Sequence, residues 1–125
     1  MQMIPDKMKE VMKHEGVVAI ATQGEDGPHL VNTWNSYLAI DADGRLLIPA
    51  GYMHVTEKNV VRNPKVLLTL GSREVQGAHG PGTGFLVEGN ARFINSGPVF
   101  ETTKSIFPWA RGVLEITISN VTQTL

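Results

Sequence analysis

The chain has 125 residues, of which 42% are apolar and 18% are charged, and its formal net charge is −1. This length predicts a single domain, residues 1–125, that can bury a core without metals or disulfides. The near-neutral charge gives no indication of non-specific binding to nucleic acid or to acidic membranes. Because the chain has no cysteine, disulfides, thiol catalysis, zinc fingers and iron–sulfur clusters are excluded as well.

The sequence contains no obvious membrane or export signal. No apolar run approaches the roughly 18 residues that a membrane-spanning helix needs. Asp6, Lys7, Lys9 and Glu10 interrupt the N-terminal stretch, which therefore does not match the apolar core of a signal peptide. We expect no membrane association and a cytoplasmic location.

The N-terminal part predicts one helix and one hairpin. Residues Met3 to His14 have an amphipathic pattern, and Gly16 can end that helix. Val17 to Gln23 is a β-rich run, and the turn sequence at residues 25–28 leads back into a second run, Leu30 to Tyr37. We expect these two runs to pair as an antiparallel hairpin.

The middle of the chain predicts two strands around a short helix. Arg45 to Pro49 follows a turn at residues 41–44, and Val66 to Leu70 continues toward Arg73. Between them, Thr56 is a suitable N-cap for a helix over Glu57 to Asn63.

The C-terminal part predicts two more strands and a third helix. Phe85 to Ile94 alternates well, and Val113 to Ile118 is the last strand. The turn sequence at residues 95–98 opens a helix that should end before Pro108. The sum is a mainly β chain of about six antiparallel strands with three short helices. That pattern favours a small closed barrel over a doubly wound nucleotide-binding fold.

The run Leu30 to Tyr37 is unusual because neither of its faces is cleanly apolar. Asn32, Thr33 and Asn35 are interleaved with Trp34 and Tyr37. Buried amides and hydroxyls require partners, and aromatic rings beside amide donors suit a flat cofactor that forms hydrogen bonds. The alternative is an edge strand with one face in water, and on this pattern alone that alternative is favoured.

Other motifs give little support to catalysis or metal binding. The glycine-rich segment 77–84 lacks the lysine of a P-loop and precedes a strand, so we interpret it as a loop at the barrel rim. The four histidines show no i, i+4 pairing and no nearby cluster of carboxylates. No serine lies in the context of a hydrolase nucleophile. We predict no metal site and no catalytic residue.

Residues around Thr56 could hold an anion. The backbone N–H groups of a helix N-terminus attract phosphate. Lys58 follows in the same helix, and Ser72 and Arg73 end a strand that can lie alongside it. The alternative is a capped surface helix with solvated charges.

Several stretches resemble the small FMN-binding proteins of sulfate-reducing bacteria. These belong to the FMN-binding split barrels and are similar to pyridoxamine 5′-phosphate oxidase. The resemblance covers nearly the whole chain, and its most specific block is the first one. The matching stretches are residues 15–37, 70–73, 80–86, 109–111 and 123–125.

The resemblance implies a six-stranded antiparallel split barrel that forms a homodimer and holds one FMN per subunit near the dimer interface. Asn32, Thr33 and Trp34 would contact the flavin, and Trp109 would flank it. The phosphate would lie near Thr56, Lys58, Ser72 and Arg73. Glu15 and Leu125 would approach the flavin from the partner subunit.

One position departs from the pattern of the resembled proteins. They have a lysine after the histidine where this chain has Val55. The loss of one charge-assisted contact to phosphate would weaken FMN binding by roughly 1.5–3 kcal/mol, about ten- to a hundredfold.

Three functions are consistent with these residues. The first is an FMN electron carrier that acts with an unidentified redox partner protein, since a carrier needs no general acid or base. The second is a flavin-dependent oxidase or reductase of a small organic substrate, with Arg111 or His79 reading the substrate. The third is a dimeric binding module that has lost FMN.

Overall fold

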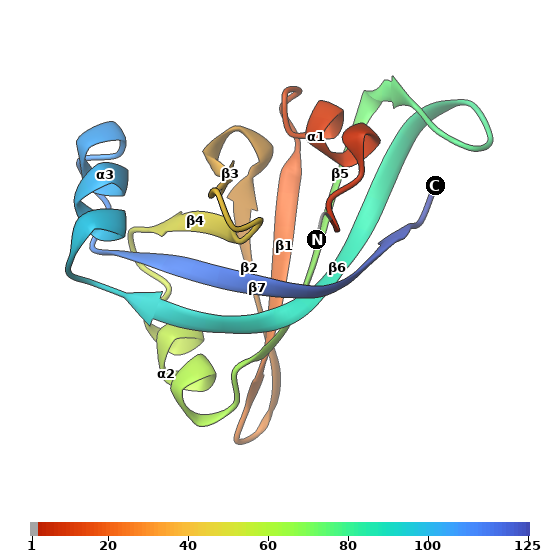
Figure 1. The fold of residues 1–125 in the computed structure, drawn as a ribbon. Helices are drawn as coiled ribbons and strands as arrows, with labels where there is room; N and C mark the ends of the chain where they lie inside the picture. Colours follow the sequence, from red (N-terminus) through yellow and green to blue (C-terminus); the bar gives the residue numbers. More distant parts are fainter. Residues whose placement is uncertain (1–2) are drawn as a thin grey trace.

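Seven strands form one antiparallel sheet in the computed structural model, which describes residues 3–125 (Figure 1). Their spatial order is β2-β1-β5-β6-β7-β4-β3. The strands are β1 Val17–Gly24, β2 Gly27–Trp34, β3 Ala39–Ile40, β4 Leu46–Ala50, β5 Lys65–Gln76, β6 Pro81–Ile94 and β7 Gly112–Gln123. The expected mainly β class is confirmed. The seventh strand, β3, has only two residues and is too short to show a pattern in the sequence.

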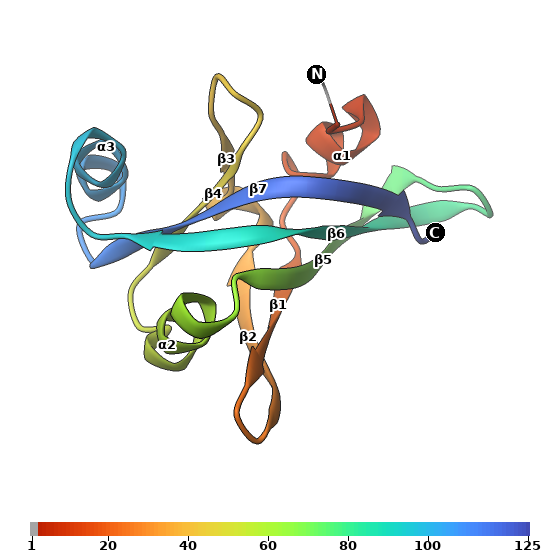
Figure 2. The same cartoon turned by 60° about the horizontal axis from the view of Figure 1, so that its bottom comes forward.

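The sheet is a split barrel rather than a closed one. Strands β6 and β7 are long and curved, and they cross β1 and β2 at a steep angle (Figures 1 and 2). The order ends at β2 on one side and at β3 on the other, and within residues 3–125 these two strands do not pair. The closed barrel expected from the strand pattern is therefore wrong, and the split form expected from the resemblance holds.

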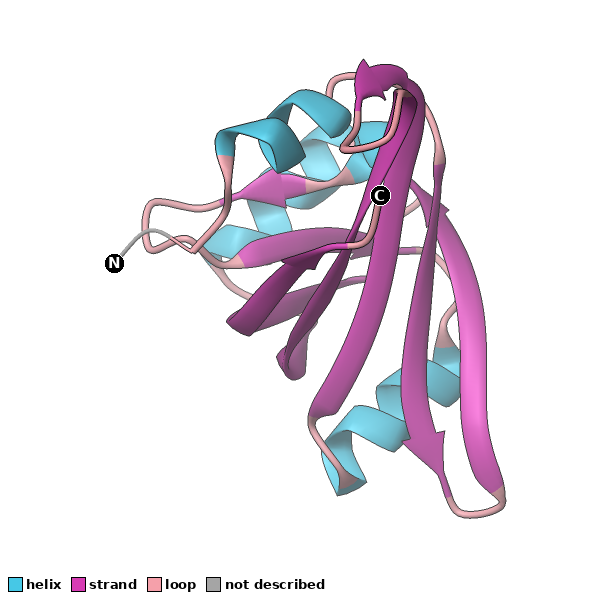
Figure 3. Cartoon of the chain, turned by 90° about the vertical axis from the view of Figure 1, so that its right-hand side faces the viewer, coloured by secondary structure: helices cyan, strands magenta, loops and turns pink. Residues whose placement is uncertain are grey.

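Three helices lie around the sheet (Figure 3). Helix α1, Asp6–Val11, packs on β5 and β6, and α2, His54–Arg62, packs on β1 and β6. Helix α3, Pro98–Ile106, packs on β7 and ends before Pro108, as predicted. The predicted N-terminal helix, Met3 to His14, is longer than the one observed.

The core follows from side-chain alternation along the strands. On β5, Val66, Leu68 and Leu70 are buried, while Leu67 and Thr69 between them face outward. Phe85 and Val87 of β6, Leu114 and Ile116 of β7, and Ile4, Met8 and Val11 of the N-terminal segment complete the same cluster. Burial on this scale drives the sheet to curl around one interior.

The predicted hairpin of residues 17–37 is confirmed, but its second strand ends early. Strands β1 and β2 pair from Val17 with Trp34 to Gly24 with Gly27. Residues Asn35–Tyr37 form a 3₁₀ turn instead of continuing the strand. The Asn35 side chain explains the break, since it is buried and its Nδ2 donates to the carbonyls of Val11, His14 and Gly71 at 3.3, 2.9 and 2.9 Å.

Helix α2 also begins earlier than predicted. Thr56 is not the N-cap but the third helical residue, because the helix starts at His54. Met53 precedes it in a left-handed conformation with φ of 57°, and no side chain caps the helix. The predicted glycine-rich loop is shorter than expected as well, since residues 81–84 belong to β6.

Candidate functional site

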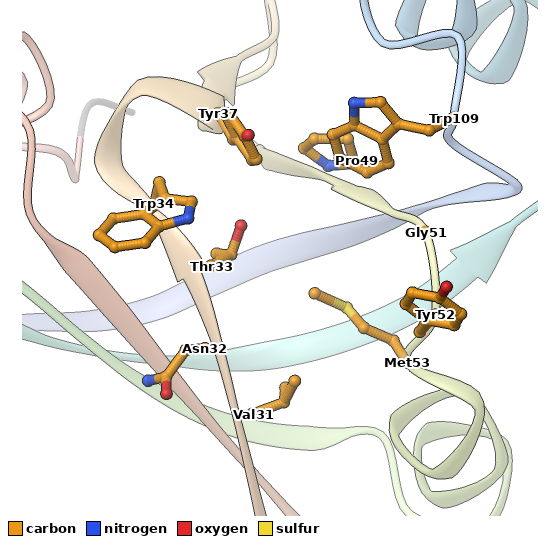
Figure 4. Close-up of a pocket in the computed structure, with 10 residues that line it drawn as sticks. All are labelled: Val31, Asn32, Thr33, Trp34, Tyr37, Pro49, Gly51, Tyr52, Met53 and Trp109. Atoms are coloured by element: carbon orange, nitrogen blue, oxygen red, sulfur yellow. The ribbon is translucent and has the colours of Figure 1, made fainter.

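A cavity of about 510 Å³ opens between the end of β2 and the loop that joins β4 to α2 (Figure 4). The β2 side is the predicted polar–aromatic stretch, and the opposite side is the segment Pro49 to Met53. Its lining residues are Val31, Asn32, Thr33, Trp34, Tyr37, Pro49, Gly51, Tyr52, Met53 and Trp109. Among residues 3–125, no Asp, Glu, Lys, Arg or His lines this cavity.

Alternation along β2 places polar and aromatic groups at this cavity. Thr33 is buried, at 6% exposure, whereas Asn32 and Trp34 are exposed. The Asn32 Nδ2 donates to the Val18 carbonyl over a long 3.4 Å. Its amide oxygen stays accessible, so this side chain can form further hydrogen bonds with a bound molecule.

Aromatic rings form one wall of the cavity. The Tyr37 ring lies 5.5 Å from the Trp109 ring and 5.2 Å from the Phe107 ring, centroid to centroid. Trp109 packs over the backbone at Gly51, where a Cβ atom would lie 3.0 Å from the indole Cε3. The glycine thus allows the indole to lie close to the β4–α2 loop (Figure 4).

The start of α2 supplies candidate anion donors beside the cavity. Tyr52 and Met53 line the cavity, and the helix begins at the next residue. Thr56 is fully buried, and its hydroxyl has no hydrogen-bond partner within residues 3–125. Thr56 does not line the cavity, but an unsatisfied hydroxyl in the first turn of a helix fits a phosphate bound at that helix end. Lys58 is exposed on the same helix and does not line the cavity.

The remaining predicted site residues lie in a second cavity of about 480 Å³. Its lining includes Glu15, Ser72, Arg73 and Leu125. Within one chain, the structure therefore does not bring Ser72 and Arg73 together with Thr56. The chain instead presents two sites, one at β2 with Asn32, Thr33, Trp34 and Trp109, and one at the junction of β5 and β6.

Glu15 is held as a carboxylate in the second cavity. Its Oε2 accepts a hydrogen bond from the Ser36 hydroxyl at 2.8 Å, and its Oε1 accepts one from the Ser36 backbone N–H at 3.2 Å. These hydrogen bonds lower the pKa of Glu15 below its ordinary value. The side chain is therefore negatively charged at neutral pH.

Sequence reasoning missed the segment Gly51 to Met53. It carried no motif and was interpreted only as irregular chain between a strand and a helix. The available signal was Gly51 beside an aromatic residue directly after a buried strand. The Tyr52 side chain is 85% exposed, whereas tyrosine side chains are usually at least partly buried.

Neither residue suggested for substrate recognition lines the first cavity. The Arg111 guanidinium donates to Tyr52 and Glu57, and His79 is exposed in the turn between β5 and β6. Within residues 3–125, no group of three or more His, Cys, Asp or Glu side chains could hold a metal ion. None of the described helices is long and apolar enough to cross a bilayer.

Comparison with known proteins agrees with this geometry. A model of the pyridoxamine 5′-phosphate oxidase family matches residues 4–124. The FMN-binding protein of Nitratidesulfovibrio vulgaris (strain DSM 19637 / Miyazaki F) is 58% identical over 123 residues, covering 98% of this chain and all of that protein.

Solved structures share the fold at low sequence identity. HupZ of Group A Streptococcus superposes with a TM-score of 0.80 at 18% identity, covering 98% of this chain and 94% of that one. An FMN-binding protein of Syntrophomonas wolfei gives 0.72 at 12% identity, covering 96% and 85%. The family model covers residues 4–124, and the FMN-binding protein is 58% identical over 123 residues. This chain therefore belongs to the pyridoxamine 5′-phosphate oxidase family.

Proposed function

We propose that this protein is an FMN-binding electron carrier that holds one flavin per chain in the cavity between β2 and the β4–α2 loop. The cavity of about 510 Å³ is within the range of small-molecule sites. Trp34, Trp109 and Tyr37 offer ring faces for the isoalloxazine, and Asn32 and Thr33 offer polar groups. The relative that is 58% identical bears the name FMN-binding protein.

The start of α2 is the proposed place for the FMN phosphate. The orphaned hydroxyl of Thr56 and the free N–H groups of the first helical turn suit phosphate oxygens. Val55 is exposed at this helix end and carries no charge. The phosphate is therefore held mainly by backbone and hydroxyl donors, with Lys58 as a more distant cation.

The electron-carrier proposal rests on one observation. Within residues 3–125, no charged or imidazole side chain lines the cavity. FMN supplies the redox chemistry when it is bound, and the chain binds, orients and covers it. Without a lining acid or base, the cavity is poorly equipped to move protons to or from an organic substrate. No cation of the same chain lines the cavity, and in the proposed dimer the Glu15 carboxylate of the other chain opposes negative charge on the reduced flavin, which predicts a low reduction potential.

A homodimer is part of the proposal. The middle of the outward face of β2, β1 and β5 carries no charged residue where the three strands pair, at Leu30–Ala21–Leu67 and Asn32–Ala19–Thr69, and Lys65 and Arg73 lie toward its ends. Leu30 is 69% exposed there, Val17 51%, Trp34 45% and Leu67 37%. A continuous uncharged face of this kind is typical of an interface between subunits. Pairing through it would allow Glu15, Ser72, Arg73 and Leu125 of one chain to approach the flavin of the other.

The alternative is a flavin-dependent oxidase or reductase of a small organic substrate, in line with the family name. Anaerobic stopped-flow measurements distinguish the two functions. We expect the reduced, FMN-loaded protein to reoxidise rapidly with a one-electron acceptor. We also expect no turnover with pyridoxamine 5′-phosphate or other small amines. Sustained turnover of such a substrate would contradict the carrier and support the oxidase. The cytoplasmic location and the existence of a redox partner protein stay predictions.

A further inference from the structure

Arg111 fastens the loop that carries the start of α2. Its backbone N–H donates to the Ala50 carbonyl at 2.9 Å. In its side chain, Nε and Nη2 both donate to the Tyr52 carbonyl, at 3.0 and 2.6 Å. The guanidinium also lies over the Phe93 ring, 4.9 Å from its centroid. The loop is thus fixed by one arginine that is distant in sequence.

The fastened segment is the one whose conformation orients the helix end. Tyr52 is followed by Met53, a non-glycine residue with φ of 57°. Such a conformation is strained and persists only where neighbouring groups fix the backbone. The two hydrogen bonds to the Tyr52 carbonyl supply that restraint directly before the helix begins.

Arg111 also neutralises a carboxylate at the helix end. Its Nη1 donates to Glu57 Oε1 at 2.9 Å, and both side chains are about one-third exposed. Glu57 lies in the first turn of α2. A free carboxylate there would repel an anion that approaches the same N–H groups.

We propose that Arg111 is a positioning residue for the phosphate of the flavin and sets the preference of this chain for FMN over a flavin without phosphate. The inference rests on the proposed function, because it assumes that the flavin phosphate lies at the start of α2. In this chain Val55 supplies no cation at that end. Phosphate affinity therefore depends on the orientation of the helix and on the neutralisation of Glu57.

The test is a pair of titrations of the flavin-free protein, one with FMN and one with riboflavin. For Arg111→Met we expect the Kd for FMN to rise about ten- to a hundredfold, the range of one charge-assisted contact, and the Kd for riboflavin to change by less than about threefold. Arg111→Lys keeps the charge but cannot make the forked contact, so we expect an intermediate loss that is again selective for FMN.

Arg62→Met is the matched control. Arg62 lies at the other end of α2, where its Nη2 donates to the Gln23 carbonyl at 3.3 Å. This variant makes the same change in net charge as Arg111→Met, but at the far end of the helix, and we expect FMN affinity to change by less than about twofold. Adding Glu57→Gln to Arg111→Met should restore part of the FMN affinity, because it removes the unpaired carboxylate.

Two results would overturn the inference while leaving the proposed function intact. One is an equal loss of FMN and riboflavin affinity in both Arg111 variants, which would mean that the loop serves the whole pocket. The other is a loss of FMN affinity in Arg62→Met as large as in Arg111→Met, which would indicate net charge alone. A wild-type protein that binds neither flavin would instead contradict the proposed function itself.

Discussion

At the scale of single residues, the buried hydroxyl of Thr56 should favour FMN binding while lowering the stability of the flavin-free protein. Its Oγ1 has no partner within the described residues. We expect Thr56→Val to stabilise the flavin-free protein by about 1 kcal/mol, since a valine removes an unsatisfied polar group at nearly constant shape. The same change should weaken FMN binding about tenfold. Thermal unfolding and FMN titration measure the two effects.

Thr22→Val is the control for that prediction. Thr22 is also buried, but its hydroxyl accepts a hydrogen bond from Asn59 Nδ2 at 3.1 Å. The substitution leaves that amide without its acceptor and should lower stability by about 1–3 kcal/mol, with FMN affinity nearly unchanged. If both variants are destabilised alike, Thr56 has no special role.

Glu15 should tune the reduction potential of the flavin. Its carboxylate accepts two hydrogen bonds from Ser36, and its lowered pKa keeps it charged at neutral pH. In the proposed dimer this charge opposes the negative charge of a reduced flavin. Glu15→Gln should therefore raise the potential, by on the order of 20 mV. Spectroelectrochemical titration measures it, with Glu10→Gln on α1 as control, and an unchanged or lower potential contradicts this account.

The lowered pKa of Glu15 also fixes the sign of its effect on pH-dependent stability. A carboxylate whose folded-state pKa lies below its unfolded value contributes stability above the unfolded value. That contribution is lost as the pH falls through the folded-state pKa. The contribution is small because the group is exposed.

Asn35 shows what residue patterns can and cannot predict. Strand β2 is an edge strand with Asn32 exposed, and of the two amides only Asn35 is buried. The residue pattern favoured such an edge strand with one face in water over inward amides. It could not show which partner satisfies each amide. Asn35 donates to three backbone carbonyls from α1, the following turn and β5, so its role is structural. Asn32, three residues earlier, makes one long bond and stays available for a ligand.

At the scale of elements, the β4–α2 loop and the Trp109 segment form one wall of the pocket. Gly51 lies directly beneath the indole, where a Cβ atom would be 3.0 Å from Cε3. We expect Gly51→Ala to displace the half-exposed ring into the cavity. FMN affinity should fall about tenfold, while stability changes by no more than about 1 kcal/mol, because the ring is free to move.

A double-mutant cycle tests that contact. In a Trp109→Ala background, Gly51→Ala should have almost no further effect on the Kd for FMN, since the ring that it displaces is gone. Additive losses in the double variant would show that the two residues act independently, and would contradict the contact as the cause.

The start of α2 could not be located from local sequence. Thr56 is the nearest conventional N-cap, and it was therefore predicted to begin the helix. The actual start depends on Met53 in a left-handed conformation and on Arg111, which lies 59 residues from Tyr52 along the chain. Local propensity carries no information about such a contact. By contrast, the β1–β2 hairpin is encoded by a local turn and alternation, and it was predicted correctly.

At the scale of the whole molecule, the outward face of β2, β1 and β5 should be the dimer interface. Leu67 lies on this face opposite Ala21. We expect Leu67→Arg to weaken dimerisation about a hundredfold or more, because it places an unpaired charge in a buried interface. Light scattering coupled to size exclusion measures the effect. Val61→Arg on α2, where Val61 is 80% exposed, should leave the dimer intact.

Loss of the dimer should also weaken FMN binding, since the proposed site needs the second cavity of the partner. A Leu67→Arg monomer that binds FMN as tightly as the wild type would show that each chain holds flavin alone. Equal dimerisation of wild type and variant would place the interface elsewhere. The sequence predicted the dimer through resemblance rather than from a recognisable interface, because an uncharged face is visible only once strands are paired in register.

The most direct test of the flavin site uses the two tryptophans of the chain, both of which line the same cavity. If FMN binds there, titration should quench most of the tryptophan fluorescence and saturate at one FMN per chain. Trp34→Phe and Trp109→Phe should each retain quenching of the remaining indole. If FMN binds and the fluorescence of both tryptophans stays unchanged at saturation, the assignment of this cavity as the flavin site is contradicted.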